Sequence, residues 1–137
     1  MCDMKKILFF MTLLVCSLGT ARAENGAEIK FDKLVHSFGS FSEKSPVVTC
    51  TFTYTNVGDK PLVINQAVAS CGCTVPEYTK TPVKPGEKGT IKVTYNGTGK
   101  FPGHFKKSIT VRTNGVVEMT RLYIEGDMIE ESKSESN

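Results

Sequence analysis

Hydrophobic and polar residues alternate along much of this chain. The clearest run spans residues 47–55, where Val48, Cys50, Phe52 and Tyr54 alternate with threonines. A period of two, built from β-branched and aromatic residues, predicts a strand that buries one of its faces. No long stretch repeats its apolar residues at the helical spacing. The pattern therefore predicts an all-β protein.

Turn-forming residues divide the rest of the chain into further short strands. We predict strands at residues 29–31, 35–38, 62–68, 90–95, 104–113 and 116–125. Asn114-Gly115, between the last two, predicts a tight hairpin turn. About seven to eight short strands with regularly spaced turns are typical of a single immunoglobulin-like β-sandwich. The chain contains no tryptophan, so it lacks the Cys…Trp…Cys pattern of antibody domains.

The two ends of the chain differ from the predicted sandwich. Lys5 and Lys6 precede an apolar run at residues 7–18, and Ala21-Arg22-Ala23 follows it. This order predicts a secretory signal peptide over residues 1–23, whose apolar run is too short to span a bilayer. Three further segments are then expected: a linker at 24–28, the sandwich domain at 29–126, and a disordered Glu- and Ser-rich tail at 127–137.

Removal of the signal peptide would leave a mature chain of nearly balanced charge. The net charge of +3 owes much to Lys5, Lys6 and Arg22. No basic stripe or basic amphipathic helix remains, so neither nucleic acid nor a membrane surface is a predicted partner, and the mature chain has no predicted membrane span. A lipid-anchored form would use Cys16, but this residue follows Val15 where a lipobox requires a small residue.

Three cysteines remain in the mature chain: Cys50, Cys71 and Cys73. An odd number in an exported protein leaves at least one of them free, metal-bound or paired between molecules. Cys50 lies on the predicted core face of its strand, where a free cysteine packs as a small apolar side chain. Cys71-Gly72-Cys73 follows the strand at residues 62–68 and is expected in a loop at a sheet edge.

The sequence leaves three interpretations of Cys71-Gly72-Cys73 open. The cysteines could shape and rigidify one loop, either reduced or bridged around Gly72, and this is the preferred interpretation. A disulfide that closes so small a ring would be strained, and therefore labile and oxidising, which suits thiol exchange on exported substrates. Two thiolates could instead bind a soft ion, and copper as Cu(I) is the cofactor that this alternative predicts. No thioredoxin-like βαβ pattern surrounds the pair.

No other residues form a recognisable catalytic set, and we expect no enzyme activity. His36 and His104 are isolated in the sequence and are expected at the surface rather than as ligands. Lys106-Lys107 is expected at a solvated strand edge, where lysines discourage edge-to-edge pairing. Asn96-Gly97-Thr98 is a glycosylation sequon, which matters only in a eukaryotic secretory pathway.

Two segments of the chain together resemble a known family. One is Phe52-Thr53-Tyr54-Thr55-Asn56-Val57-Gly58-Asp59-Lys60-Pro61-Leu62, behind Phe38-Gly39, and the other is Ser70-Cys71-Gly72-Cys73-Thr74-Val75-Pro76-Glu77, followed by Pro85-Gly86-Glu87. Over residues 29–126 the sequence resembles the bacterial family called domain of unknown function 1573. The resemblance implies an exported immunoglobulin-like domain with no assigned reaction, in which Cys71, Gly72 and Cys73 match the family's motif.

These observations predict a non-enzymatic binding or structural module of the bacterial cell envelope, in the periplasm or at the cell surface. Its expected partner is an envelope protein or glycan, contacted through sheet edges or loops, and the module is expected to be a monomer or a weak oligomer. The alternative is a thiol-based copper-binding or redox protein that uses Cys71 and Cys73.

Overall fold

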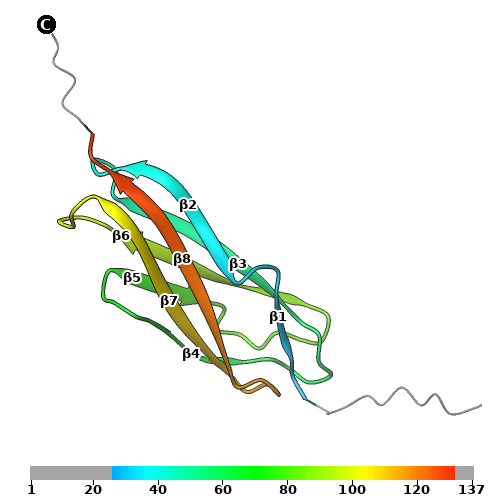
Figure 1. The fold of residues 1–137 in the computed structure, drawn as a ribbon. Coiled ribbons are helices and arrows are strands. Elements are labelled where there is room, and N and C mark those ends of the chain that lie inside the picture. The colour runs from blue at the N-terminus through cyan, green and yellow to red at the C-terminus, as the bar shows by residue number, and fades with distance from the viewer. Residues whose placement is uncertain (1–25, 132–137) are drawn as a thin grey trace, which may run out of the picture.

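Two four-stranded sheets pack face to face in the computed structural model, which describes residues 26–131 (Figure 1). The first sheet has the order β1 (Ile29–Phe31), β3 (Val47–Asn56), β6 (Lys88–Asn96), β5 (Thr74–Tyr78). The second has the order β2 (Val35–Ser42), β8 (Met119–Ile129), β7 (Gly103–Thr113), β4 (Ile64–Ala69). The predicted all-β, immunoglobulin-like sandwich is confirmed.

Some of the predicted segments lie outside the described residues. These are the signal peptide at 1–23, the first two residues of the linker, and residues 132–137 of the tail. Among residues 26–131, no helix is long and apolar enough to cross a bilayer.

The core forms where the inward faces of the two sheets meet. Along β3, the alternation seen in the sequence buries Cys50, Phe52 and Tyr54, which pair across the sheet with Val93, Ile91 and Gly89 of β6. The largest fully buried apolar side chains are Tyr54, Phe52, Leu62, Ile91, Ile109, Leu122 and Ile124. Each buried side chain of this size stabilises the fold by about 1.5–3 kcal/mol relative to exposure.

The N-terminal part of the chain is divided between the two sheets. β1 runs antiparallel to β3 in the first sheet, and β2 runs parallel to β8 in the second. Two backbone hydrogen bonds secure the crossing: Asp32 N donates to Thr53 O (3.0 Å), and Tyr123 N donates to Leu34 O (2.8 Å). β2 is therefore an edge strand, held on one side only by β8.

Two sequence-based predictions were wrong at the C-terminal end of the sandwich. The tail was expected from residue 127, but β8 continues to Ile129, because Met128 is buried while Asp127 faces solvent. The expected tight turn at Asn114-Gly115 is a longer loop, closed by Thr113 N donating to Glu118 O (2.8 Å). The Asn114 side chain instead holds the neighbouring segment, since its Oδ1 accepts from Val63 N at 2.8 Å.

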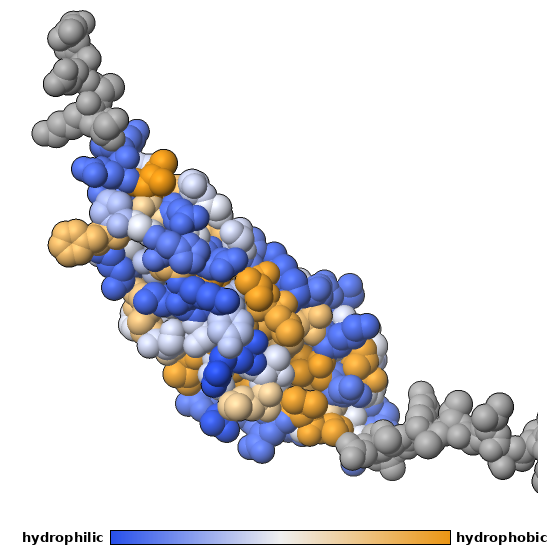
Figure 2. Space-filling view, viewed as in Figure 1, coloured by the Kyte–Doolittle hydropathy of each residue, from blue (hydrophilic) through white to orange (hydrophobic). Residues whose placement is uncertain are grey.

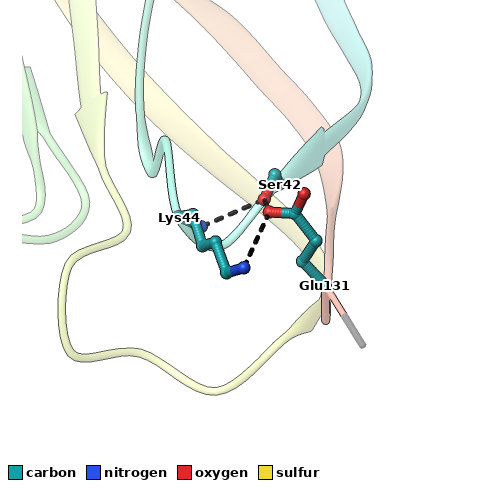
Figure 3. Close-up of polar contacts among 3 residues, drawn as sticks. All are labelled: Ser42, Lys44 and Glu131. Carbon is teal, nitrogen blue, oxygen red and sulfur yellow. Dashed lines mark hydrogen bonds and ion pairs between the residues drawn. The ribbon is translucent and has the colours of Figure 1, made fainter. Parts of the chain in front are cut away.

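A polar clasp holds the chain just beyond β8 (Figure 3). Ser42 Oγ donates to Glu131 Oε2 (2.8 Å) and accepts from Lys44 N (3.1 Å), while Lys44 Nζ lies 3.7 Å from Glu131 Oε2. Both charged side chains are exposed, so the ion pair contributes at most about 1 kcal/mol. These contacts tie Glu131, within the predicted tail, to the β2–β3 turn.

Candidate functional site

The Cys71-Gly72-Cys73 segment lies at a corner where the chain passes from one sheet to the other. β4 ends at Ala69 in the second sheet, and β5 begins at Thr74 in the first. Ser70 N donates to Ser108 O of β7 (2.9 Å), and Asn96 N of β6 donates to Cys73 O (2.8 Å). Backbone hydrogen bonds thus fasten this corner to both sheets.

Cys71 and Cys73 are joined by a disulfide, with their Cα atoms 5.3 Å apart. Both cysteines are partly exposed and Gly72 is exposed. A Cβ placed on Gly72 would have no other atom within 4 Å, so nothing covers the ring on that side. Cys73 packs against the hydrophobic core, whereas Cys71 is not among the residues that do.

Thr74, which sequence reasoning missed, places a buried hydroxyl against this disulfide. Thr74 is only 3% exposed, and its Oγ1 lies 3.7 Å from both Cys71 Sγ and Cys73 Sγ. Its backbone N donates to Cys71 O (3.3 Å). The hydroxyl is therefore in position to donate a hydrogen bond to either sulfur.

Lys106 and Lys107 were expected at a strand edge, and this prediction was wrong. They lie on β7, which is an inner strand between β8 and β4. Lys106 faces solvent, with Nζ 5.0 Å from the centroid of the Tyr123 ring. Lys107 is partly buried and lies on the face of β7 that also carries buried Ile109. Ala69 pairs with Ile109 at the end of the β4–β7 ladder, and Ser70 N, next to Cys71, donates to Ser108 O, next to Lys107.

Cys50 is separate from this corner. It is a free cysteine, buried in the core as the alternation predicts, and pairs with Val93 of β6. Burial raises the pKa of the Cys50 thiol to about 11, against a smaller lowering by Lys33. A thiol with so high a pKa is almost wholly protonated at neutral pH, and the protonated form is a poor nucleophile and metal ligand.

The histidines are not brought to the disulfide corner. His104 is exposed on β7, and its Nδ1 lies 2.9 Å from Asp127 Oδ1 on β8. His36 is partly buried on β2, where burial and then nearby Lys33 lower its pKa. Within residues 26–131, no group of three or more His, Cys, Asp or Glu residues is arranged to hold a metal ion. Copper binding therefore stays a prediction for the reduced Cys71–Cys73 pair, because a disulfide offers no thiolate.

The four edge strands differ in how open they are to pairing. β1 has only three residues, and β4 has six, with a register shift between Ile64 and Gln66. On either side of β5, Cys73 O accepts from Asn96 N of β6, and Thr79 N donates to Thr90 O of β6. The backbone N–H and C=O groups of every second residue between Cys73 and Thr79 therefore also point toward β6, and the backbone nitrogen of Pro76 points outward. Pro76 has no N–H to offer and blunts that edge.

β2 is the longest edge strand, with eight residues and neither proline nor lysine. Two backbone hydrogen bonds to β8 flank this strand: Leu34 O accepts from Tyr123 N before it, and Glu43 N donates to Ile129 O after it. Around the register shift between Ser37 and Ser40, this pattern directs the backbone groups of Val35, Ser37 and Ser40 away from β8. The β2 edge thus presents unpaired N–H and C=O groups over most of its length.

The two packed sheets place this chain in the broad class of immunoglobulin-like sandwiches. It is similar to a protein of unknown function from Porphyromonas gingivalis W83, with a TM-score of 0.65 and 12% identity over 82% of this chain; the match covers 51% of the P. gingivalis chain. It is also similar to PapD-like domain 7 of human CEP192, with a TM-score of 0.63 and 9% identity over 86% of this chain and 97% of that domain. The periplasmic chaperone SfaE matches with a TM-score of 0.52 and 11% identity, over 77% of this chain and 59% of the chaperone.

Sequence comparison narrows the class to one family. The chain belongs to the family described as protein of unknown function DUF1573, which matches residues 29–128. Comparison with curated proteins finds no match. The chain spans about half the length of the P. gingivalis protein that shares its fold.

Proposed function

We propose that this chain is a non-enzymatic binding or structural module of the bacterial cell envelope, which takes up an extended protein segment along the β2 edge. The observation that carries the proposal is the open backbone of β2, with outward groups at Val35, Ser37 and Ser40. An extended peptide can add to such an edge because main-chain hydrogen bonds supply affinity without requiring one particular sequence.

The side chains around β2 indicate what kind of segment would fit. Phe38 and Phe41 are only partly buried against the core, and their ring centroids lie 6.4 and 5.9 Å from that of Phe105. Leu34 and Val35 are 50% and 44% exposed. An added strand with apolar residues at alternate positions would cover the two phenylalanines, since alternate side chains of a strand share one face.

The molecular surface supports this choice of edge. Figure 2 shows that hydrophobic residues gather on the half of the visible face that holds β1 and the start of β2. Exposed Val57 and Val116, in loops at that end, and Met119, at the start of β8, add to this apolar area. Apolar area beside an open edge favours a protein partner over a glycan, because it gives an extended polypeptide side-chain contacts as well as main-chain pairing.

The comparisons support the class of function and not the partner. Two solved structures of similar fold are named as chaperones, YadV and periplasmic SfaE, at 15% and 11% identity. These identities carry the fold alone, so the envelope location rests on the export pattern at residues 1–23.

A cross-linking experiment tests the proposal. A photo-reactive amino acid at Ser40, on β2, is compared with the same group at Val75, which is 54% exposed on the blunted edge strand β5. In intact bacterial envelopes we expect a cross-linked partner from Ser40 and none from Val75. Hydrogen exchange on the purified complex should then show slower exchange of the Val35, Ser37 and Ser40 amides.

A proline at Ser37 supplies the decisive variant. Ser37→Pro removes an outward N–H without removing a bond to β8, whereas Ser37→Ala removes only the hydroxyl that accepts from Gly39 N. We expect Ser37→Pro to abolish the cross-link and Ser37→Ala to keep it. Capture that survives the proline, or equal capture from Val75, would show that the partner does not pair with β2.

A further inference from the structure

The disulfide corner is held in place by contacts other than the disulfide itself. Ser70 is bonded to β7, Cys73 O to β6, and Thr74 N to Cys71 O. Only one residue separates the two cysteines, so their bond joins no distant parts of the chain. Opening the bond therefore leaves both sheets and their connection intact.

The same corner is accessible and has a polar group aimed at the sulfurs. The Gly72 side of the ring is open, and Cys71 is the sulfur that does not pack on the core. The buried Thr74 hydroxyl lies 3.7 Å from each sulfur and can donate to whichever one becomes a thiolate. Hydrogen bonds to a charged acceptor are stronger than those to a neutral one, so this contact strengthens when the disulfide opens.

From these contacts we infer that the Cys71–Cys73 disulfide oxidises protein dithiols by thiol–disulfide exchange. A thiolate of the substrate attacks Cys71 Sγ and forms a mixed disulfide, while Cys73 leaves as a thiolate that accepts a hydrogen bond from Thr74. The second substrate thiolate then attacks the substrate sulfur that is bonded to Cys71, and Cys71 leaves as a thiolate. The substrate leaves with a new disulfide, and two electrons and two protons have passed to Cys71 and Cys73.

One lysine of β7 lies near this corner: Lys107 is next to Ser108, whose backbone O accepts from Ser70 N, next to Cys71. A positive charge near a disulfide favours an incoming thiolate. Cys50 takes no part, because it is buried in the core away from the corner. The activity goes beyond strand binding, since β4 and β2 lie at opposite edges of the second sheet.

The test uses the protein purified after export, with its disulfide intact, and a reduced synthetic peptide that carries two cysteines. We expect one peptide disulfide per protein molecule, formed at least tenfold faster than by an equal concentration of oxidised glutathione. Alkylation and peptide mapping should then find two new thiols, at Cys71 and Cys73. A rate no faster than that of glutathione, or new thiols elsewhere, would overturn the proposal.

Variants separate the chemistry from a merely structural role. Cys73→Ser should leave Cys71 able to form a stable mixed disulfide with an oxidised cysteine peptide, and Cys71→Ser should form far less. Thr74→Val should slow exchange about tenfold. It should also raise the pH at which reduced Cys73 is alkylated at half its maximal rate. Thr74→Ser should restore both the exchange rate and this pH. Unchanged kinetics and pH profile in a folded Thr74→Val protein would refute the role of Thr74. Cys50→Ala and Ser37→Pro should leave exchange unchanged.

Discussion

Asn56 is a buried polar residue that joins three segments of the chain, so its removal tests how this fold is held together. It ends β3 and is fully buried. Its Nδ2 donates to Lys60 O (2.7 Å) and Val83 O (2.9 Å). Its Oδ1 accepts from Gly58 N (3.0 Å) and Glu28 N (3.3 Å). One side chain thus satisfies four backbone groups.

The expected cost of Asn56→Ala follows from these bonds. Each hydrogen bond contributes about 1 kcal/mol net, and a buried group left unpaired costs about 1–3 kcal/mol. The free energy of unfolding should therefore fall by about 4 kcal/mol, from a total that is about 5–15 kcal/mol for a domain of ordinary size. A loss of this size would leave little stability in a marginal domain.

The chain offers a matched control at Asn114. Its Oδ1 accepts from Val63 N (2.8 Å) and its Nδ2 donates to Pro61 O (3.1 Å), but both bonds are exposed. Because water can replace them, Asn114→Ala should cost about 1 kcal/mol or less. Guanidinium chloride unfolding followed by circular dichroism measures both variants. Equal losses, or a loss below about 1.5 kcal/mol for Asn56→Ala, would refute the argument from burial.

An aspartate at the same position adds a test by pH. Asn56→Asp replaces the Nδ2 donor with an oxygen that faces Lys60 O and Val83 O. Burial and the two carbonyls raise the pKa of the new carboxyl in the folded state above the unfolded value of about 3.9. Stability should then be greatest below about pH 4 and fall as pH rises. A variant whose stability rises between pH 4 and 7 would contradict this reasoning.

Three further predictions concern single residues. Gly89→Ala should lower stability by about 1–3 kcal/mol, measured by thermal unfolding, because a Cβ there would collide with the Tyr54 ring. Cys50 should resist alkylation in the folded protein at pH 8, because burial raises its pKa from the ordinary value of 9.0 to about 11. The stability tied to its protonated thiol is therefore present below pH 9 and lost as pH rises through about 11, a fall that Cys50→Ala should lack. Phe101→Ser should change the free energy of unfolding by less than about 0.5 kcal/mol, since Phe101 is 96% exposed.

The strands that could be predicted are those whose burial shows as alternation. β3 and β6 pair along nearly their whole length and bury every second residue, so their sequences carry the period of two. β5 was missed because Pro76 interrupts a short run, although a proline is compatible with an edge strand. The end of β8 was missed because Asp127 and the acids beyond it concealed buried Met128.

The disulfide corner was located by its cysteines, but its surroundings could not be derived from sequence. Thr74 reaches the sulfurs because the chain changes sheets between Ala69 and Thr74, and sheet membership depends on distant partners in β6 and β7. The position of Lys107 depends in the same way on the β4–β7 register. One local signal was available: Thr74 directly follows the second cysteine and, as a β-branched residue, favours the start of a strand.

The edges of the two sheets give a reason to regard the β2 edge as functional. Exposed edges invite aggregation, and proteins protect them with short strands, prolines or covering segments. Here β1 is short, Pro76 blunts β5, and β4 is shorter than β2 and has a register shift between Ile64 and Gln66. β2 carries a register shift at Ser37–Ser40 but keeps outward backbone groups on both sides of it, with exposed Leu34 and Val35 at its start. The open edge of β2, longer than that of any other edge strand, is the one best suited to pair with an added strand.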